Sequence, residues 1–151
     1  MGDPNATLDR LFELTSLLGD EMAQSLAVRG LTRARAAIVW RLFHEGPMTQ
    51  RQISTALNVT RANITGLLDA LEEGGFVARN PHPTDRRATL VGITDKGRTA
   101  ADAMHRDHEE FAGRLFAGLT ADELTLFDVA LSHVLAQIRP GAATGVPHPD
   151  R

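Results

Sequence analysis

The chain has 151 residues and a mass of 16.4 kDa, a length that predicts one domain or two small interleaved ones. Hydrophobic residues make up 42% of the chain and charged residues 23%, which excludes a disordered or collagen-like protein. The absence of cysteine excludes disulfides, thiolate metal sites and cysteine nucleophiles. No apolar run reaches the roughly 18 residues of a membrane span and no secretory signal is visible, so we expect a soluble cytoplasmic protein.

The formal net charge of -3 is unevenly distributed along the chain. Residues 33–98 carry ten Lys and Arg against six Asp and Glu, which is +4, and the remainder carries six against thirteen, which is -7. A basic centre between acidic ends favours a polyanionic partner such as nucleic acid.

Two helices are predicted first. Apolar residues spaced three and four apart begin at Leu8 and form a wide stripe on a helix that ends at Gly30. Thr32 caps a second helix, which stops where Gly46 is followed by Pro47. A stripe as wide as that of the first helix indicates contact with more than one neighbour, either within the chain or in a second copy.

The next segment predicts two short helices joined by a tight turn. Thr49 and Gln52 have the spacing of a capping box, which opens a short helix. Asn58 ends it, because asparagine tolerates the left-handed conformation that such a turn requires. Thr60 then caps another helix, which Gly74 and Gly75 terminate. The result is helix, three-residue turn, helix.

A hairpin and two further helices complete the prediction. Residues 76–79 and 88–93 are rich in apolar and β-branched side chains and flank a loop with two prolines, the pattern of two strands with a long tip. A long helix starts at Thr94-Asp95, and Thr120 with Glu123 forms a second capping box before the last helix. Residues 140–151 are expected to form a frayed tail.

The segment TQRQISTALNVTRANITGLLDALEEGGFVAR (49–79), with the DRR tip and the LVGITDKG that follows it, resembles the MarR family of winged helix-turn-helix regulators. The resemblance implies a mainly α fold of three helices plus a two-stranded β-hairpin wing, with dimerisation helices at both ends. The implied domains are an N-terminal dimerisation helix (1–31), a DNA-binding domain (32–94), C-terminal dimerisation helices (95–139) and a disordered tail (140–151).

The helix at 61–73 carries the predicted base contacts. At 100° per residue, its leucines and Ile64 occupy one side, and small uncharged residues occupy the start of the other. A solvated surface would favour long charged side chains, whereas a small surface suits entry into the major groove. Packing against another part of the protein is the alternative. The residues expected at DNA here are Arg61, Ala62, Asn63, Thr65 and Gly66.

The hairpin tip is the second predicted contact, because arginines beside prolines give a semi-rigid cationic finger suited to the minor groove. The resemblance implies that Asp85 orients the tip while Arg87 inserts, and Arg86 is expected at phosphate. An ordinary exposed turn is the alternative. Supporting phosphate contacts are expected from the helix starts and the wing base, namely Thr49, Gln50, Arg51, Thr60 and Arg79.

The expected function is a homodimeric regulator, most simply a repressor, that binds a pseudo-palindromic site on double-stranded DNA and is released by a small aromatic or carboxylate ligand. The family resemblance implies the ligand pocket, because the family places one between its dimerisation helices and DNA-binding module. An amphipathic ligand needs aromatic side chains around it and one polar group to bind, which suggests the lining residues, although Trp40 and Phe43 also fit an ordinary core. The candidate lining residues are Arg10, Met22, Trp40, Phe43 and His44.

Two alternatives remain from the sequence. One is a winged-helix module that binds protein, and the other is a zinc-responsive regulator that uses His105 and His108, which are three residues apart on a helix. No phosphate loop, nucleophile elbow or zinc-protease motif occurs, so no catalysis, cofactor or resident metal is expected.

Overall fold

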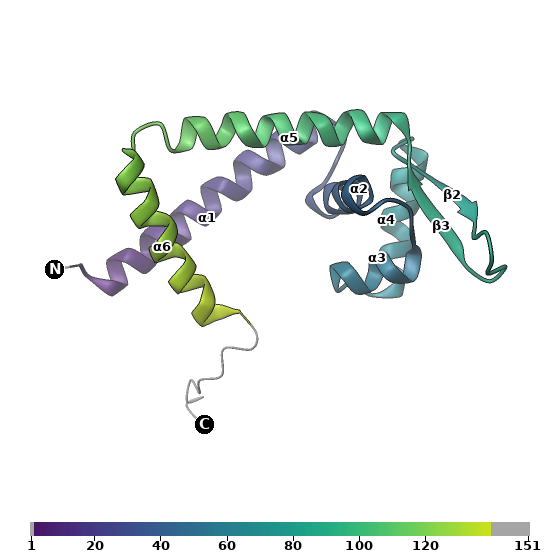
Figure 1. Cartoon of the computed structure of the whole chain (residues 1–151), viewed down its shortest axis with the longest axis horizontal. Helices are drawn as coiled ribbons and strands as arrows, with labels where there is room; N and C mark the ends of the chain where they lie inside the picture. The colour runs from purple at the N-terminus through teal and green to yellow at the C-terminus, as the bar shows by residue number, and fades with distance from the viewer. Residues whose placement is uncertain (1, 140–151) are drawn as a thin grey trace, which may run out of the picture. The chain divides into compact units, whose positions relative to one another are not determined.

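The computed structural model describes residues 2–139, which form six helices and one small sheet (Figure 1). The described residues fall into two compact units, one ending at His108 and one beginning at Glu109. The predicted tail at 140–151 lies outside the described residues. No helix among residues 2–139 is long and apolar enough to cross a membrane. In chain order the elements are α1 (Pro4–Ala27), α2 (Arg33–Glu45), β1 (Met48–Thr49), α3 (Gln50–Leu57), α4 (Arg61–Glu73), β2 (Val77–Pro81), β3 (Thr89–Ile93), α5 (Asp95–Leu115) and α6 (Ala121–Ile138).

The helix-turn-helix forms as its capping residues predict. Thr49 accepts a hydrogen bond from the backbone N–H of Gln52, and the Gln52 side chain accepts one from the Thr49 backbone, so both halves of the capping box are present. Asn58 lies in the left-handed region with φ 51° and ψ 47°. The Ser54 hydroxyl donates to the Val59 carbonyl at 2.7 Å and closes the turn before Thr60 caps α4.

The sheet has three antiparallel strands in the order β1-β3-β2, one strand more than the sequence predicts. The hairpin pairs Val77 with Ile93 and ends with Pro81 opposite Thr89, on an edge strand that tolerates proline. The additional strand is β1, in which Met48 pairs with Val91. This strand has only two residues, Met48 after Pro47 and Thr49 at the start of the capping box, which are too few for any alternation of polar and apolar residues, so the sequence carries no signal for it.

The core of the first unit lies between α2, α3, α4 and the sheet. Its largest side chains come from several elements that are distant in sequence, and burial of each such side chain contributes about 1.5–3 kcal/mol. Those with relative exposure below 2% are Ile38, Val39, Leu42, Ile53, Ile64, Leu68, Leu71, Val77 and Val91.

The second unit is dominated by α6, whose capping box of Thr120 and Glu123 is complete. No described residue of α6 is buried, although the helix is rich in apolar side chains. Ile138 is 75% exposed, and the Phe116 and Phe127 rings contact each other with centroids 6.1 Å apart. In the first unit, α1 has a similar surface, with Phe12 64% exposed and only Leu26 buried. Both helices therefore carry apolar surface that their own unit leaves exposed.

The start of α5 approaches the beginning of the hairpin very closely at Gly97. A Cβ atom placed there would lie 2.2 Å from the Phe76 carbonyl oxygen and 2.6 Å from Ile93 Cγ1. The Thr94 backbone N–H also donates to the Phe76 carbonyl at 3.1 Å, which holds the two segments together. Glycine is therefore required at this position for α5 to pack against the base of the wing.

We predict that Gly97→Ala lowers the free energy of unfolding by about 1–3 kcal/mol, because the new methyl group must displace backbone atoms. Gly66→Ala is the control, since nothing lies within 4 Å of the added methyl and alanine favours a helix by about 1 kcal/mol. Urea unfolding of both variants measures the difference. A Gly97→Ala protein as stable as the wild type would contradict the close approach.

Candidate nucleic-acid interface

The helix α4 buries one side and exposes the other. Ile64, Leu68 and Leu71 are fully buried in the core of the first unit. The opposite side exposes a set of short side chains, here called the small-residue face, which consists of Ala62, Asn63, Thr65, Gly66 and Asp69. A Cβ atom added at Gly66 would have no neighbouring atom within 4 Å. The alternative was that this face packs against another part of the protein. In the described part of the first unit the face stays exposed, although Gln50 bonds to Thr65 and Arg79 bonds to Asp69.

A hydrogen bond links the first residue of α3 to the small-residue face. The Gln50 side-chain amide donates to the Thr65 hydroxyl at 2.6 Å, and the Thr65 hydroxyl donates to the Arg61 carbonyl at 3.0 Å. The sequence placed Gln50 at a phosphate and Thr65 at a base edge, without any contact between them. The structure instead joins these two side chains into one polar group on the surface of the helix-turn-helix.

The two helix starts offer backbone donors rather than side-chain donors. The Thr49 hydroxyl and backbone N–H both donate to the Gln52 side chain, and the Thr60 hydroxyl accepts from the Asn63 backbone. These threonines are thus occupied as caps. The first two backbone N–H groups of α3 and of α4, those of Gln50, Arg51, Arg61 and Ala62, have no partner in their own helices and are suited to an anion.

The tip of the hairpin is organised by local hydrogen bonds. The Asp85 carboxylate accepts from the Arg87 backbone N–H at 2.9 Å. The orienting role that the family resemblance implies for Asp85 stays a prediction. His82 Nδ1 accepts from the backbone N–H groups of Thr84 and Asp85 at 3.3 and 3.1 Å. Sequence reasoning missed His82, although a histidine between two prolines before Thr-Asp was the available signal. The tip is therefore a structured turn.

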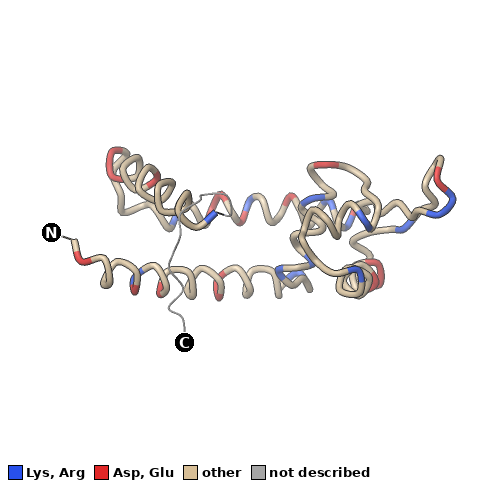
Figure 2. Tube along the Cα trace, turned by 90° about the horizontal axis from the view of Figure 1, so that it is seen from below, with Lys and Arg blue, Asp and Glu red and all other residues tan. Residues whose placement is uncertain are grey.

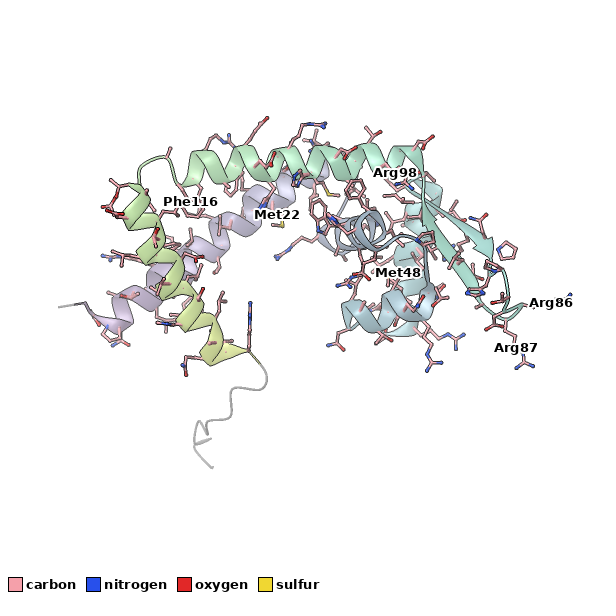
Figure 3. All side chains as sticks on the ribbon, viewed as in Figure 1. Met22, Met48, Arg86, Arg87, Arg98 and Phe116 are labelled. Carbon is pink, nitrogen blue, oxygen red and sulfur yellow. The ribbon has the colours of Figure 1, made fainter. Side chains whose placement is uncertain are left out.

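The cationic side chains at this end of the first unit extend outward. Arg86 and Arg87 are exposed, and their side chains point away from the hairpin tip (Figure 3). Figure 2 shows the tip as a cluster of basic positions beside one acidic position. Within residues 2–139, no carboxylate pairs with the guanidinium groups of Arg51, Arg61, Arg86 or Arg87. These four positive charges are available to a polyanion.

Arg79 differs from those arginines because two carboxylates of α4 hold it. Its guanidinium contacts Asp69 at 2.7 Å and Glu72 at 2.6 Å, and its backbone N–H donates to Glu72 at 3.1 Å. These bonds connect β2 to α4. The expected phosphate contact from Arg79 stays a prediction, and the bonds support a structural role in which Arg79 fixes the wing relative to α4.

The same contacts change the ionisation of Glu72. The side-chain hydrogen bond from Arg79, with a further bond from the Arg79 backbone, holds the pKa of Glu72 below its usual value. The charged form of Glu72 is therefore favoured in the folded protein.

The candidate ligand residues are only partly brought together. The rings of Trp40, Phe43 and His44 contact one another, with centroids 4.4 Å apart for Trp40 and His44 and 5.2 Å for Phe43 and His44. An open hollow of about 360 Å³ lies beside Trp40 and His44. Arg10 and Met22 are on α1 and do not line it. The lining residues are Ala37, Trp40, Arg41, His44, Glu45 and Leu57.

The two histidines proposed for zinc lie in α5 and are exposed. The His105 ring stacks beside Trp40 with centroids 6.0 Å apart. In the part of the chain that the structure describes, no group of three His, Asp or Glu side chains is placed to hold a metal ion. The geometry therefore gives no support to the zinc alternative.

Comparison with known proteins identifies the family. The model of the MarR family matches residues 31–89, which contain the helix-turn-helix and the hairpin tip. An uncharacterized HTH-type transcriptional regulator of Bacillus subtilis, YdgJ, is 32% identical over 113 residues, which are 75% of this chain and 66% of the relative. The crystal structure of a mutant MarR from E. coli is 27% identical with a TM-score of 0.69, over 85% of this chain and 96% of that one.

The chain belongs to the MarR family. The fold is the winged helix of that family, and the relatives are named as transcriptional regulators, which are not enzymes. Another similar structure is that of Streptococcus pneumoniae FabT in complex with DNA, with a TM-score of 0.76, 21% identity and coverage of 88% and 95% of the two chains. That likeness supports the fold. This chain spans just under two thirds of the length of YdgJ.

For this MarR-family chain we predict that Glu72→Gln lowers stability at neutral pH but not in acid. The folded pKa of Glu72 is depressed, so its ion pair contributes fully above the ordinary glutamate pKa and is lost as the pH falls through the lowered value. The difference in unfolding free energy between wild type and variant should be constant from pH 7 to 5, shrink as the pH falls below the ordinary glutamate pKa of about 4.3, and disappear only below the depressed pKa of the folded protein.

Urea unfolding at a series of pH values measures this difference. Glu73→Gln is the matched control, because Glu73 is an exposed neighbour on α4 with no ion pair among the described residues. A stability difference for Glu72→Gln that does not depend on pH would exclude the ion pair with Arg79 as its cause.

Proposed function

We propose that this chain is a homodimeric transcriptional regulator that binds a specific, pseudo-palindromic site on double-stranded DNA. The observation that carries the proposal is the small-residue face of α4 lying exposed beside helix starts and a hairpin tip with unpaired arginines. Residues 32–94 would bind DNA, while residues 1–31 and 95–139 would pair with a second copy. The DNA complex of FabT, which shares this fold, is consistent with such a role.

The small-residue face suits the major groove. A groove about 12 Å wide admits an α-helix, and the short side chains of Ala62, Thr65 and Gly66 let the helix backbone approach the bases closely. Asn63 at the margin of the face presents both an acceptor and a donor, the combination that pairs with adenine. Arg61 at the start of α4 is exposed and unpaired, so it reaches either a phosphate or a guanine.

The hairpin tip suits the adjacent minor groove. Negative potential in a narrow minor groove attracts guanidinium groups, and Arg86 and Arg87 extend from a turn that Asp85 and His82 hold in shape. Arg79 connects the hairpin to α4, so helix and tip would meet the DNA as one body. Arg87 is assigned to the groove and Arg86 to phosphate.

Pairing of two copies would cover the apolar surfaces of the end helices. Both α1 and α6 leave large apolar side chains exposed within their own units, and such surfaces commonly mark protein interfaces. A two-fold pair would place two α4 helices about one DNA turn apart and would read a site with matching symmetry.

Relief of repression by a small ligand is part of the proposal. The contact of Trp40 with Phe43 and His44, beside a hollow of about 360 Å³, supports an aromatic or carboxylate-bearing ligand there. Such a ligand would act only if it bound one arrangement of the paired DNA-binding domains more tightly than another.

We predict that Arg87→Ala weakens DNA binding mainly at A·T-rich minor-groove positions, and that Asn63→Ala relaxes base preference at one major-groove position in each half-site. Each substitution is expected to cost about 1–3 kcal/mol of binding free energy at the position it affects. Mobility shifts with duplexes substituted at single positions measure both. Arg106→Ala, which removes an exposed arginine on α5, is the charge-matched control. Unchanged affinity and base preference in both variants would contradict the proposed contacts.

For pairing, we predict that Val134→Glu converts a dimer to a monomer, because the charge would be placed on the apolar side of α6 that also carries Phe127 and Ile138. Ala136→Glu is the matched control, since residue 136 lies on the opposite side of the helix at 100° per residue. Analytical ultracentrifugation distinguishes the two species. A wild-type chain that sediments as a monomer at micromolar concentration would refute the homodimer.

A further inference from the structure

Gln50 lies over the small-residue face of α4 although it belongs to α3. It is the first residue of α3, and its amide nitrogen is 2.6 Å from the hydroxyl of Thr65, fifteen residues later. The two helices are neighbours in the first unit (Figure 1). The Gln50 side chain is half-buried, and Thr65 is exposed near the middle of the face proposed to enter the major groove.

The hydroxyl of Thr65 fixes which end of the Gln50 amide faces it. A hydroxyl has one hydrogen, and that of Thr65 is donated to the Arg61 carbonyl one turn earlier at 3.0 Å. Thr65 therefore has only acceptor capacity left for Gln50. The Gln50 amide must then present its nitrogen to Thr65, and its carbonyl oxygen cannot take that place.

The bond to Thr65 leaves an unused edge on the Gln50 amide. An amide nitrogen has two hydrogens, so one N–H and the carbonyl Oε1 have no partner among the described residues. A donor and an acceptor side by side match the N7 acceptor and N6 donor of adenine in the major groove. Guanine offers two acceptors there, so it does not satisfy Oε1.

We propose that Gln50 is a base-reading residue, which Thr65 holds in position to bind the major-groove edge of one adenine in each half-site. This inference rests on the proposed DNA-binding function and adds a determinant of sequence that comes from α3 instead of α4. Thr65 is then a positioning residue. Its hydroxyl is occupied, and its methyl group is the part that remains for contact with a base.

The sequence predicts that Gln50 contacts a phosphate, but that contact would use fewer of the hydrogen-bonding groups of its amide. A phosphate only accepts hydrogen bonds, so it would leave Oε1 of Gln50 without a partner. The backbone N–H groups at the start of α3 already provide donors for a phosphate. A side chain that is ordered before binding also loses less rotamer freedom when it binds, which favours its use for recognition.

The test begins with selection of bound sites from a random duplex library by the full-length wild-type chain. Each adenine of the selected site is then replaced by 7-deazaadenine, which lacks the N7 acceptor, and affinities are measured by fluorescence anisotropy. We expect this replacement to weaken wild-type binding about tenfold at the adenine that Gln50 reads in each half-site, which is separate from the adenine assigned to Asn63. Gln50→Ala should weaken binding to the unmodified site and be insensitive to the replacement at that adenine alone.

Three further variants separate base reading from positioning. Gln50→Glu can only accept, so it should shift the preferred base at that position from adenine toward cytosine, whose N4 is a donor. Thr65→Val loses the hydroxyl but keeps the shape, and it should reduce the adenine discrimination several-fold. Thr65→Ser keeps the hydroxyl and should retain the discrimination. Thermal unfolding of each variant confirms that the fold is intact.

Three outcomes decide the matter. Loss of adenine discrimination in Gln50→Ala and Thr65→Val, but not in Thr65→Ser, supports the inference. A uniform loss of affinity in Gln50→Ala, with the same 7-deazaadenine profile as the wild type, assigns Gln50 to a phosphate and overturns the inference while the proposed function stands. Failure of the wild-type chain to enrich any duplex at low ionic strength overturns both.

Discussion

The structure depends on the burial of one side of α4. Ile64, Leu68 and Leu71 are fully enclosed by α2, α3 and the sheet, and each buried side chain contributes about 1.5–3 kcal/mol. This burial fixes the rotation of the helix about its axis, so the residues on its other side must be exposed. That other side consists of short side chains, which lets a helix approach another macromolecule closely. The function proposed for the chain follows from this orientation.

The wing is connected to the same helix by contacts that are not local in sequence. Arg79 on β2 pairs with Asp69 and Glu72 on α4, and the Thr94 hydroxyl donates to the Gly75 carbonyl at 2.6 Å. Gly97 then lets α5 pack against the Phe76 backbone. Each contact constrains the position of the hairpin relative to α4, so the arginines at the tip and the small-residue face are held on one framework.

Local signals in the sequence predicted much of this fold. The capping boxes at Thr49 and Thr120 and the left-handed Asn58 need only a few neighbouring residues, and all are confirmed. The features that the sequence did not predict depend on contacts between distant segments. Strand β1 exists only because β3 provides its partner, and the bond from Gln50 to Thr65 requires the packed angle between α3 and α4. The roles of Arg87, Asn63 and the ligand candidates stay predictions, because they concern molecules that the chain does not contain.

A hydroxyl-radical footprint of the full chain on a selected duplex would show whether two copies bind DNA through α4 and the hairpin tip, because it reports both grooves and both half-sites at once. A homodimer bound through α4 and the hairpin tip should give two symmetric sets of protected sugars about one DNA turn apart, with outer protections in the minor groove that disappear in Arg87→Ala. A single protected patch without symmetry, or no protection at low ionic strength, would contradict it.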